Sequence, residues 1–140
     1  VNRTVDKAEA LAEELAPYLE SDRLEGPGDR LKVFSLTSPE VIPEADHVDL
    51  IVNATSVGLK RSDSSPLSSS CLQPHHLVYD TIYNPSQTRL LHEAERIGAR
   101  AANGCSLLLH QGVLSFELWF PGKQPLATMR RSLKNTLSTQ

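Results

Sequence analysis

Cysteine is scarce in this 140-residue sequence, which contains only Cys71 and Cys105. Two cysteines without the spacing of metal ligands exclude a disulfide-rich framework and are typical of reduced thiols in a cytoplasmic protein. The five histidines are scattered except for His75 and His76, and adjacent side chains do not share one face of a helix or strand. We therefore expect no metal site.

Long apolar runs and an excess of positive charge are absent as well. No apolar run reaches the roughly 18 residues that indicate a transmembrane helix. Lys and Arg number 14 against 17 Asp and Glu, which gives a formal net charge of -3, and the basic residues are not clustered. These features exclude a basic nucleic-acid-binding domain and a membrane span, so neither nucleic acid nor membrane is an expected partner. The length suits one domain with its own core.

The sequence also lacks an initial methionine and the glycine-rich G-x-G-x-x-G loop of dinucleotide-binding folds. It starts instead with Val1 and Asn2, a pattern that indicates the last residues of a strand. We therefore expect the sequence to begin inside a domain. The cytoplasm is the expected compartment, and a plastid stays open because a targeting segment would precede Val1.

A phosphate-binding turn is one interpretation of the first residues. Apolar residues recur at three- and four-residue spacing over 4–20 and predict a helix, with Thr4 as the expected N-cap. Arg3 would lie beside the helix N-terminus, where backbone N–H groups and the helix dipole favour an anion, and Lys7 would add a second positive charge. An ordinary capped helix with two solvated basic residues is the alternative, and these few residues alone favour it.

Farther along the chain, short apolar strands alternate with helical patterns. The serine-rich stretch 62–70 is expected to be a surface loop. Near-continuous apolar strands separated by helices predict an α/β fold built on a parallel sheet. Strands are expected at 31–36, 49–53, 77–83 and 99–102, and helices at 38–45, 86–97, 106–120 and 126–137.

Polar or glycine-bearing segments follow four of the expected strands. In an open parallel sheet the carboxyl ends of the strands meet at one edge, where ligands bind. We therefore expect these four segments to form one ligand-binding edge. They are Asn2-Arg3, Asn53-Ala54-Thr55, Asp80-Thr81-Ile82-Tyr83 and Asn103-Gly104.

In order and spacing, these segments resemble the signatures of shikimate dehydrogenases, the NADP-dependent oxidoreductases of aromatic amino-acid biosynthesis. The likeness extends over essentially the whole chain and implies a Rossmann-like parallel sheet that lacks its first strand and most of its second. The matching stretches are NRTVDKA at 2–8, NATSVGL at 53–59, VYDTIYNP at 78–85 followed by Thr88, Leu90 and Leu91, and NGCSLLLHQG at 103–112 followed by Phe116 and Trp119.

The resemblance implies that residues 1–140 are the C-terminal part of an NADP-binding domain. The family's N-terminal substrate domain, its glycine-rich pyrophosphate loop and its catalytic Lys and Asp lie outside this sequence, so no catalytic residue is assigned here. The terminal helices, at about 105–137, are expected to pack back toward the absent substrate domain. A homodimer is compatible with this arrangement.

The resemblance also assigns cofactor contacts. The first strand end carries no carboxylate to repel a 2′-phosphate, which favours NADP over NAD. Gly104 would let the backbone approach the nicotinamide closely, and Leu107 would pack against it. The full set of expected NADP-binding residues is Asn2, Arg3, Thr4, Val5, Asp6, Lys7, Thr55, Thr81, Gly104 and Leu107.

Two further residues are expected to contact the substrate, shikimate or 3-dehydroshikimate. Tyr83 and Gln111 match the positions that this domain extends toward shikimate, and a phenol and an amide both donate and accept hydrogen bonds. The alternative for Tyr83 is an aromatic side chain that simply packs. The alternative for Gln111 is a buried polar side chain satisfied by the backbone.

The leading hypothesis is part of an NADP-dependent shikimate dehydrogenase, which reversibly reduces 3-dehydroshikimate to shikimate in chorismate biosynthesis. Residues 1–140 alone are expected to be inactive, because they lack the catalytic residues. The alternatives are a quinate/shikimate dehydrogenase with looser specificity and a non-catalytic nucleotide-binding module.

Overall fold

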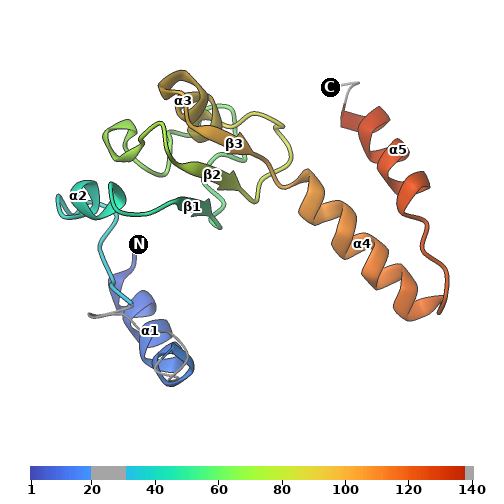
Figure 1. Cartoon of the computed structure of the whole chain (residues 1–140), viewed down its shortest axis with the longest axis horizontal. Helices are drawn as coiled ribbons and strands as arrows, with labels where there is room; N and C mark the ends of the chain where they lie inside the picture. Colours follow the sequence, from blue (N-terminus) through green and yellow to red (C-terminus); the bar gives the residue numbers. More distant parts are fainter. Residues whose placement is uncertain (20–30, 138–140) are drawn as a thin grey trace. The chain divides into compact units, whose positions relative to one another are not determined.

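The computed structural model describes residues 1–19 and 31–137 (Figure 1). The chain divides into two compact units, Val1–His47 and Val48–Gln140, which are treated separately. None of the helices within the described ranges has both the length and the apolarity that crossing a membrane requires.

The first unit contains a long helix and a short one. α1 (Val5–Leu19) agrees with the helix predicted over 4–20, and Pro17 lies inside its last turn. α2 (Val41–Ala45) is shorter than the helix predicted over 38–45. Hydrogen-bonded turns precede α2, and its first and last residues are buried.

The prediction of a strand over 31–36 is wrong. Only Ser35 pairs, in an isolated parallel bridge with Asn2. The Asn2 N–H donates to the carbonyl of Phe34 at 3.1 Å, and the Leu36 N–H donates to the carbonyl of Asn2 at 3.1 Å. Among the described residues, 31–34 pair with no other segment as a strand.

The second unit is built on a parallel sheet of three strands in the order β1-β2-β3, which confirms the predicted fold class. The strands are β1 (Leu50–Asn53), β2 (Leu77–Asp80) and β3 (Arg100–Ala102). Their register places Asn53 opposite Asp80. β2 ends before the predicted residue 83 because the side chain of Asp80 takes the N–H of Ile82 at 3.0 Å.

α3 (Arg89–Ile97) packs on this sheet. It ends at the predicted residue 97 but begins three residues after the predicted start at residue 86. The Thr88 hydroxyl accepts the Leu91 N–H at 3.4 Å as the N-cap. Gly98 ends the helix with φ 92, a left-handed conformation that favours glycine. The buried core beneath α3 consists of Leu72, Val78, Leu90, Leu91, Ala94 and Ala99.

The C-terminal residues form two helices close to their predicted bounds, α4 (Cys105–Trp119) and α5 (Leu126–Leu137). A turn at Gly122 (φ 75) reverses the chain, so that α5 packs alongside α4 (Figure 1). The serine-rich stretch forms turns and ends in a single turn of 3-10 helix, η1 (Ser69–Cys71).

Candidate functional site

The same hydrogen-bonded turn occurs at every strand exit, meaning the residues where the chain leaves a strand, and also after the isolated bridge at Asn2. At each, an Asn or Asp side-chain oxygen accepts the backbone N–H two residues later, which bends the chain away from the strand direction. Sequence alone identified these four segments as polar strand ends. The pairs are Asn2 with Thr4 at 3.1 Å, Asn53 with Thr55 at 3.1 Å, Asp80 with Ile82 at 3.0 Å and Asn103 with Cys105 at 3.2 Å.

The exits of β1 and β2 are joined through Asn53. Its amide nitrogen donates to the carboxyl of Asp80 at 3.1 Å. Its backbone carbonyl accepts both the N–H of Thr81 at 3.0 Å and the Thr81 hydroxyl at 2.9 Å. The Thr55 hydroxyl donates to the Asn53 side-chain oxygen at 2.7 Å. The structure therefore brings Thr55 and Thr81, both predicted to line the cofactor, onto neighbouring strand exits that share one residue.

The exits of β2 and β3 are joined through Gly104 and Asn103. The Gly104 N–H donates to the carbonyl of Ile82 at 3.0 Å, and the Asn103 amide donates to the carbonyl of Ser86 at 2.8 Å. A Cβ on Gly104 would overlap the carbonyl oxygen of Thr81. This contact between two strand exits is by itself sufficient to require glycine, in addition to any approach to a nicotinamide.

The loop after β1 is closed by Asp63, which sequence reasoning missed. Its carboxyl accepts the backbone N–H groups of Gly58 and Lys60, both at 3.0 Å. These bonds, from Lys60 first and then Gly58, hold the pKa of Asp63 below its usual value. Gly58 has φ 115, which favours glycine, and it packs on Ile82 and Thr88. The loop is therefore pinned against the exit of β2.

Three predicted contact residues, one after β2 and two in the first half of α4, have accessible side chains. Tyr83 is 40% exposed and Leu107 is 47% exposed. Gln111 is exposed as well, so it is not the buried, backbone-satisfied residue of the alternative interpretation. Leu107 and Gln111 are four residues apart on α4 and therefore share one helix face. Neither Tyr83 nor Gln111 makes a side-chain hydrogen bond within residues 1–19 and 31–137, so both can bond a ligand.

In the first unit the predicted basic side chains stand at the beginning of α1. Arg3 and Lys7 are exposed, and among the described residues neither forms an ion pair. The prediction that Thr4 caps α1 through its hydroxyl is wrong. The Thr4 hydroxyl makes no hydrogen bond among the described residues, and the Thr4 N–H donates to the side-chain oxygen of Asn2 at 3.1 Å. The start of α1 thus presents two exposed cations beside backbone donors, which suits an anion.

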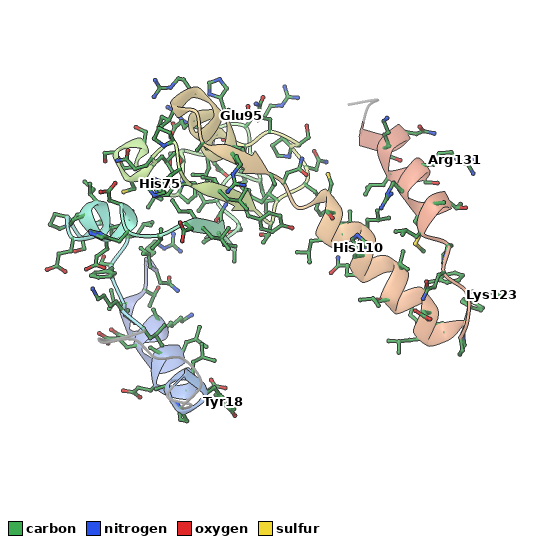
Figure 2. The ribbon with its side chains drawn as sticks, viewed as in Figure 1. Tyr18, His75, Glu95, His110, Lys123 and Arg131 are labelled. Carbon is green, nitrogen blue, oxygen red and sulfur yellow. The ribbon has the colours of Figure 1, made fainter. Side chains whose placement is uncertain are left out.

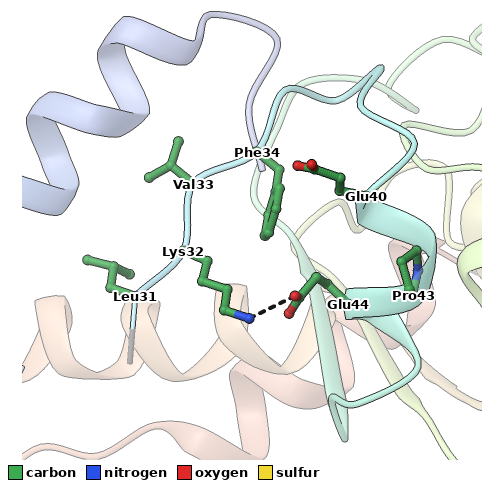
Figure 3. Close-up of a pocket in the computed structure, with 7 residues that line it drawn as sticks. All are labelled: Leu31, Lys32, Val33, Phe34, Glu40, Pro43 and Glu44. Atoms are coloured by element: carbon green, nitrogen blue, oxygen red, sulfur yellow. Dashed lines mark hydrogen bonds and ion pairs between the residues drawn. The ribbon is translucent and has the colours of Figure 1, made fainter. Parts of the chain in front are cut away.

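A hollow of about 520 Å³ lies elsewhere in the first unit, between 31–34 and α2 (Figure 3). Lys32 is the basic side chain among the described residues that line it; it is paired with Glu44 at 2.7 Å, and Glu40 adds a further carboxylate. None of the residues predicted to bind cofactor or substrate lines it. Two carboxylates and one paired lysine do not favour phosphate binding in this hollow.

Metal and thiol chemistry have little support at the strand exits. Within the part of the chain that the structure describes, no three His, Cys, Asp or Glu side chains are grouped so that they could hold a metal ion. Burial raises the pKa of the Cys105 thiol, and a hydrogen bond with Asn103 offsets part of that effect. Cys105, the first residue of α4, is therefore a poor nucleophile at neutral pH.

Known proteins resemble this chain in both sequence and structure, although no protein-family model matches it. A curated shikimate dehydrogenase (NADP(+)) of Methanopyrus kandleri is 40% identical over 134 residues, which cover 94% of this chain and 43% of that protein. A crystal structure of shikimate dehydrogenase in complex with NADP+ has a TM-score of 0.80 at 32% identity, over 98% of this chain and 45% of the other. Shikimate 5-dehydrogenase of Thermus thermophilus, in complex with NADP(H) and shikimate, has a TM-score of 0.70 at 30% identity, over 96% and 44%.

The chain is a homologue of the C-terminal, NADP-binding portion of shikimate dehydrogenases. It spans less than half the length of the shikimate dehydrogenases that it matches. The homologues are NADP-dependent oxidoreductases, and their fold is the Rossmann-like parallel α/β fold predicted from the sequence.

Proposed function

We propose that this chain forms the NADP-binding portion of a shikimate dehydrogenase. The full-length gene product, meaning the protein encoded by the complete gene that contains this sequence, reversibly reduces 3-dehydroshikimate to shikimate in chorismate biosynthesis. One observation carries the proposal. The three joined strand exits, with Thr55, Thr81 and Gly104 at their turns, belong to a chain 40% identical to an NADP-dependent shikimate dehydrogenase.

The start of α1 fits the 2′-phosphate of NADP. Arg3 offers a planar fork of donors for phosphate oxygens, Lys7 adds charge, and both are unpaired within the described residues. Asp6 lies inside the first turn of α1, so it does not occupy the strand-end position where a carboxylate would select NAD. When bound, the nicotinamide supplies the hydride chemistry. The residues of this chain hold and orient it.

The accessible side chains at the strand exits fit a polyhydroxylated acid. The Tyr83 hydroxyl and the Gln111 amide are free to donate and accept hydrogen bonds to shikimate. Leu107, on the same face of α4 as Gln111, provides an apolar contact for the nicotinamide. No catalytic acid or base is assigned to this chain. That role belongs to the proposed N-terminal substrate domain.

The apolar surface of α4 fits a contact with that substrate domain. Leu114 is 64% exposed, Leu118 82% and Trp119 77%. All three belong to α4, the helix that carries the labelled His110 in Figure 2. Side chains of this size rarely stay bare together on a soluble protein. The substrate domain is the proposed partner, and a second copy of the chain is the alternative. The cytoplasm is the proposed compartment, because both cysteines are free.

Growth complementation tests the biosynthetic role. The full-length gene product is expressed in a bacterium whose own shikimate dehydrogenase gene is deleted, on medium without aromatic amino acids. We expect growth without added shikimate. Growth that requires shikimate, despite abundant folded protein, would instead favour the non-catalytic nucleotide-binding module. A quinate/shikimate dehydrogenase also restores growth, and it is distinguished by oxidising quinate at a comparable rate.

A further inference from the structure

Asp80 is a fully buried carboxyl group that binds three different segments of the second unit. Its Oδ1 accepts the Asn53 amide at 3.1 Å and the Ile82 N–H at 3.0 Å, and its Oδ2 accepts the Thr88 hydroxyl at 2.7 Å. The donors come from the end of β1, the exit of β2 and the N-cap of α3. Asp80 itself has 0% exposure.

Packing alone does not explain a carboxyl group at this position. Burial of a carboxylate without a cation is unfavourable unless hydrogen bonds satisfy both oxygens. No Lys or Arg among the described residues pairs with Asp80. The neighbouring β2 residue Val78 is just as buried and is apolar. A carboxyl group at this position accepts three hydrogen bonds that an apolar side chain could not accept.

One of these bonds fixes the orientation of the Asn53 side chain. An acceptor at Asp80 requires the amide nitrogen of Asn53 to face it, which directs the Asn53 oxygen toward Thr55. The same nitrogen also donates to the carbonyl of Val57 at 3.1 Å, which closes the loop after β1. With the amide rotated by half a turn, two acceptors would face each other and the N–H of Thr55 would lose its partner.

We propose that Asp80 is a positioning residue for the cofactor edge of this site. It holds Thr55 through Asn53, and it holds the chain that leads to Tyr83 through Ile82. Asp80 touches neither cofactor nor substrate, because it is completely enclosed. This inference rests on the proposed function, since it concerns the alignment of NADP with shikimate.

Steady-state kinetics of the full-length gene product test the positioning role. Asp80→Leu keeps roughly the size of the side chain and removes both acceptors, whereas Asp80→Asn would keep one oxygen for Asn53 and Ile82. We expect kcat for shikimate oxidation to fall about 30-fold, since small misplacements of reacting groups reduce rates by up to about 100-fold. KM for NADP+ should change less than about threefold, because the proposed phosphate contacts at Arg3 and Lys7 are untouched.

Three further variants separate positioning from loss of stability. Leu90→Ala truncates a buried core side chain of α3 that lies outside the hydrogen-bond network. It should lower the unfolding temperature, yet leave kcat within about twofold well below that temperature. Thr88→Val removes one donor to Asp80 and should lower kcat, whereas Thr88→Ser keeps the hydroxyl and should retain it. An unchanged kcat in Asp80→Leu, or an equal loss in Leu90→Ala, would overturn the proposal.

Amide hydrogen exchange of the same proteins tests the role of Asp80 by a measurement that does not require enzymatic activity. If the wild-type protein does not oxidise shikimate, the proposed function fails while this measurement still decides the role of Asp80. In Asp80→Leu the Thr55 and Ile82 amides should exchange at least about tenfold faster, with the Leu109 amide of α4 unchanged. Unchanged exchange at Thr55 would show that Asp80 does not hold the exit of β1.

Discussion

Gly104 lies against Thr81 so closely that a Cβ on Gly104 would overlap the Thr81 carbonyl oxygen. The two residues belong to neighbouring strand exits, and the Gly104 N–H is bonded to the next carbonyl, that of Ile82, at 3.0 Å. The start of α4 is thereby held directly against the exit of β2. The glycine is needed for this contact between chain segments, even though its φ of -74 suits any residue.

Replacement of Gly104 by alanine should therefore destabilise the second unit. Backbone lies on the other side of the contact, so the overlap is relieved only by a shift of a strand exit, and we expect a loss of about 3 kcal/mol. Urea unfolding of the full-length gene product measures it. Gly112→Ala is the matched control, because a Cβ there meets nothing within 4 Å. It should stabilise α4 by about 0.5–1 kcal/mol. Equal stability of the two variants would contradict the account.

The loop closed by Asp63 should open in acid. Its pKa in the folded protein is below the usual 3.8, because the N–H groups of Lys60 and Gly58 favour the charged form. The contribution to stability is therefore present above pH 3.8 and is lost as pH falls through the lower folded value. Amide exchange at Gly58 and Lys60 should show this loss.

Asp63→Ala should expose the same two amides at neutral pH. Asp46→Ala is the control, since it removes an exposed carboxylate from the first unit with the same change in charge. Protection of the Gly58 amide that survives Asp63→Ala would show that the carboxylate does not close the loop.

Both thiols should react slowly with iodoacetamide. Burial raises the pKa of Cys71 and of Cys105, so the thiolate fraction at neutral pH is smaller than in a free cysteine. Cys71 is only 3% exposed, whereas Cys105 is partly exposed, so Cys105 should react first. Mass spectrometry over time at several pH values gives both rates. A Cys105 rate equal to that of glutathione at pH 7 would contradict the raised pKa.

Arg3→Ala should reduce the preference for NADP over NAD. A hydrogen bond to a charged group is worth about 1.5–3 kcal/mol, which corresponds to a loss of roughly 10- to 100-fold in NADP+ affinity. NAD+ affinity should be nearly unchanged, because NAD+ carries no 2′-phosphate. Arg130→Ala on α5 removes the same charge from another exposed site and serves as the control for the full-length gene product. Equal losses for both cofactors would remove Arg3 from the phosphate site.

Local signals explain which elements the sequence predicted well. The end of α3 was predicted at residue 97, and Gly98, which follows it directly, terminates the helix in the structure. α4 and α5 are long enough for their apolar patterns and the turn at 121–122 to define them. The homologues confirm the parallel α/β class, which followed from continuous apolar strands.

Pairing between distant segments explains what the sequence did not predict. The segment 31–36 has the composition of a strand, but a strand needs a partner, and Asn2 supplies only one bridge. The bond between Asn53 and Asp80 joins residues 27 apart and depends on the register of β1 and β2. The role of Asp63 in closing the loop was not predicted. Its carboxylate accepts two N–H groups of that loop, and only the structure shows the loop conformation.

The most direct test of the central claim is the rate of shikimate oxidation by the full-length gene product. NADPH formation is followed by absorbance with shikimate as the substrate, with NADP+ and NAD+ compared at equal concentrations. We predict rapid formation of NADPH, much slower formation of NADH, and no reaction by residues 1–140 alone. A folded full-length protein that binds NADP+ but forms no NADPH from shikimate would contradict the account.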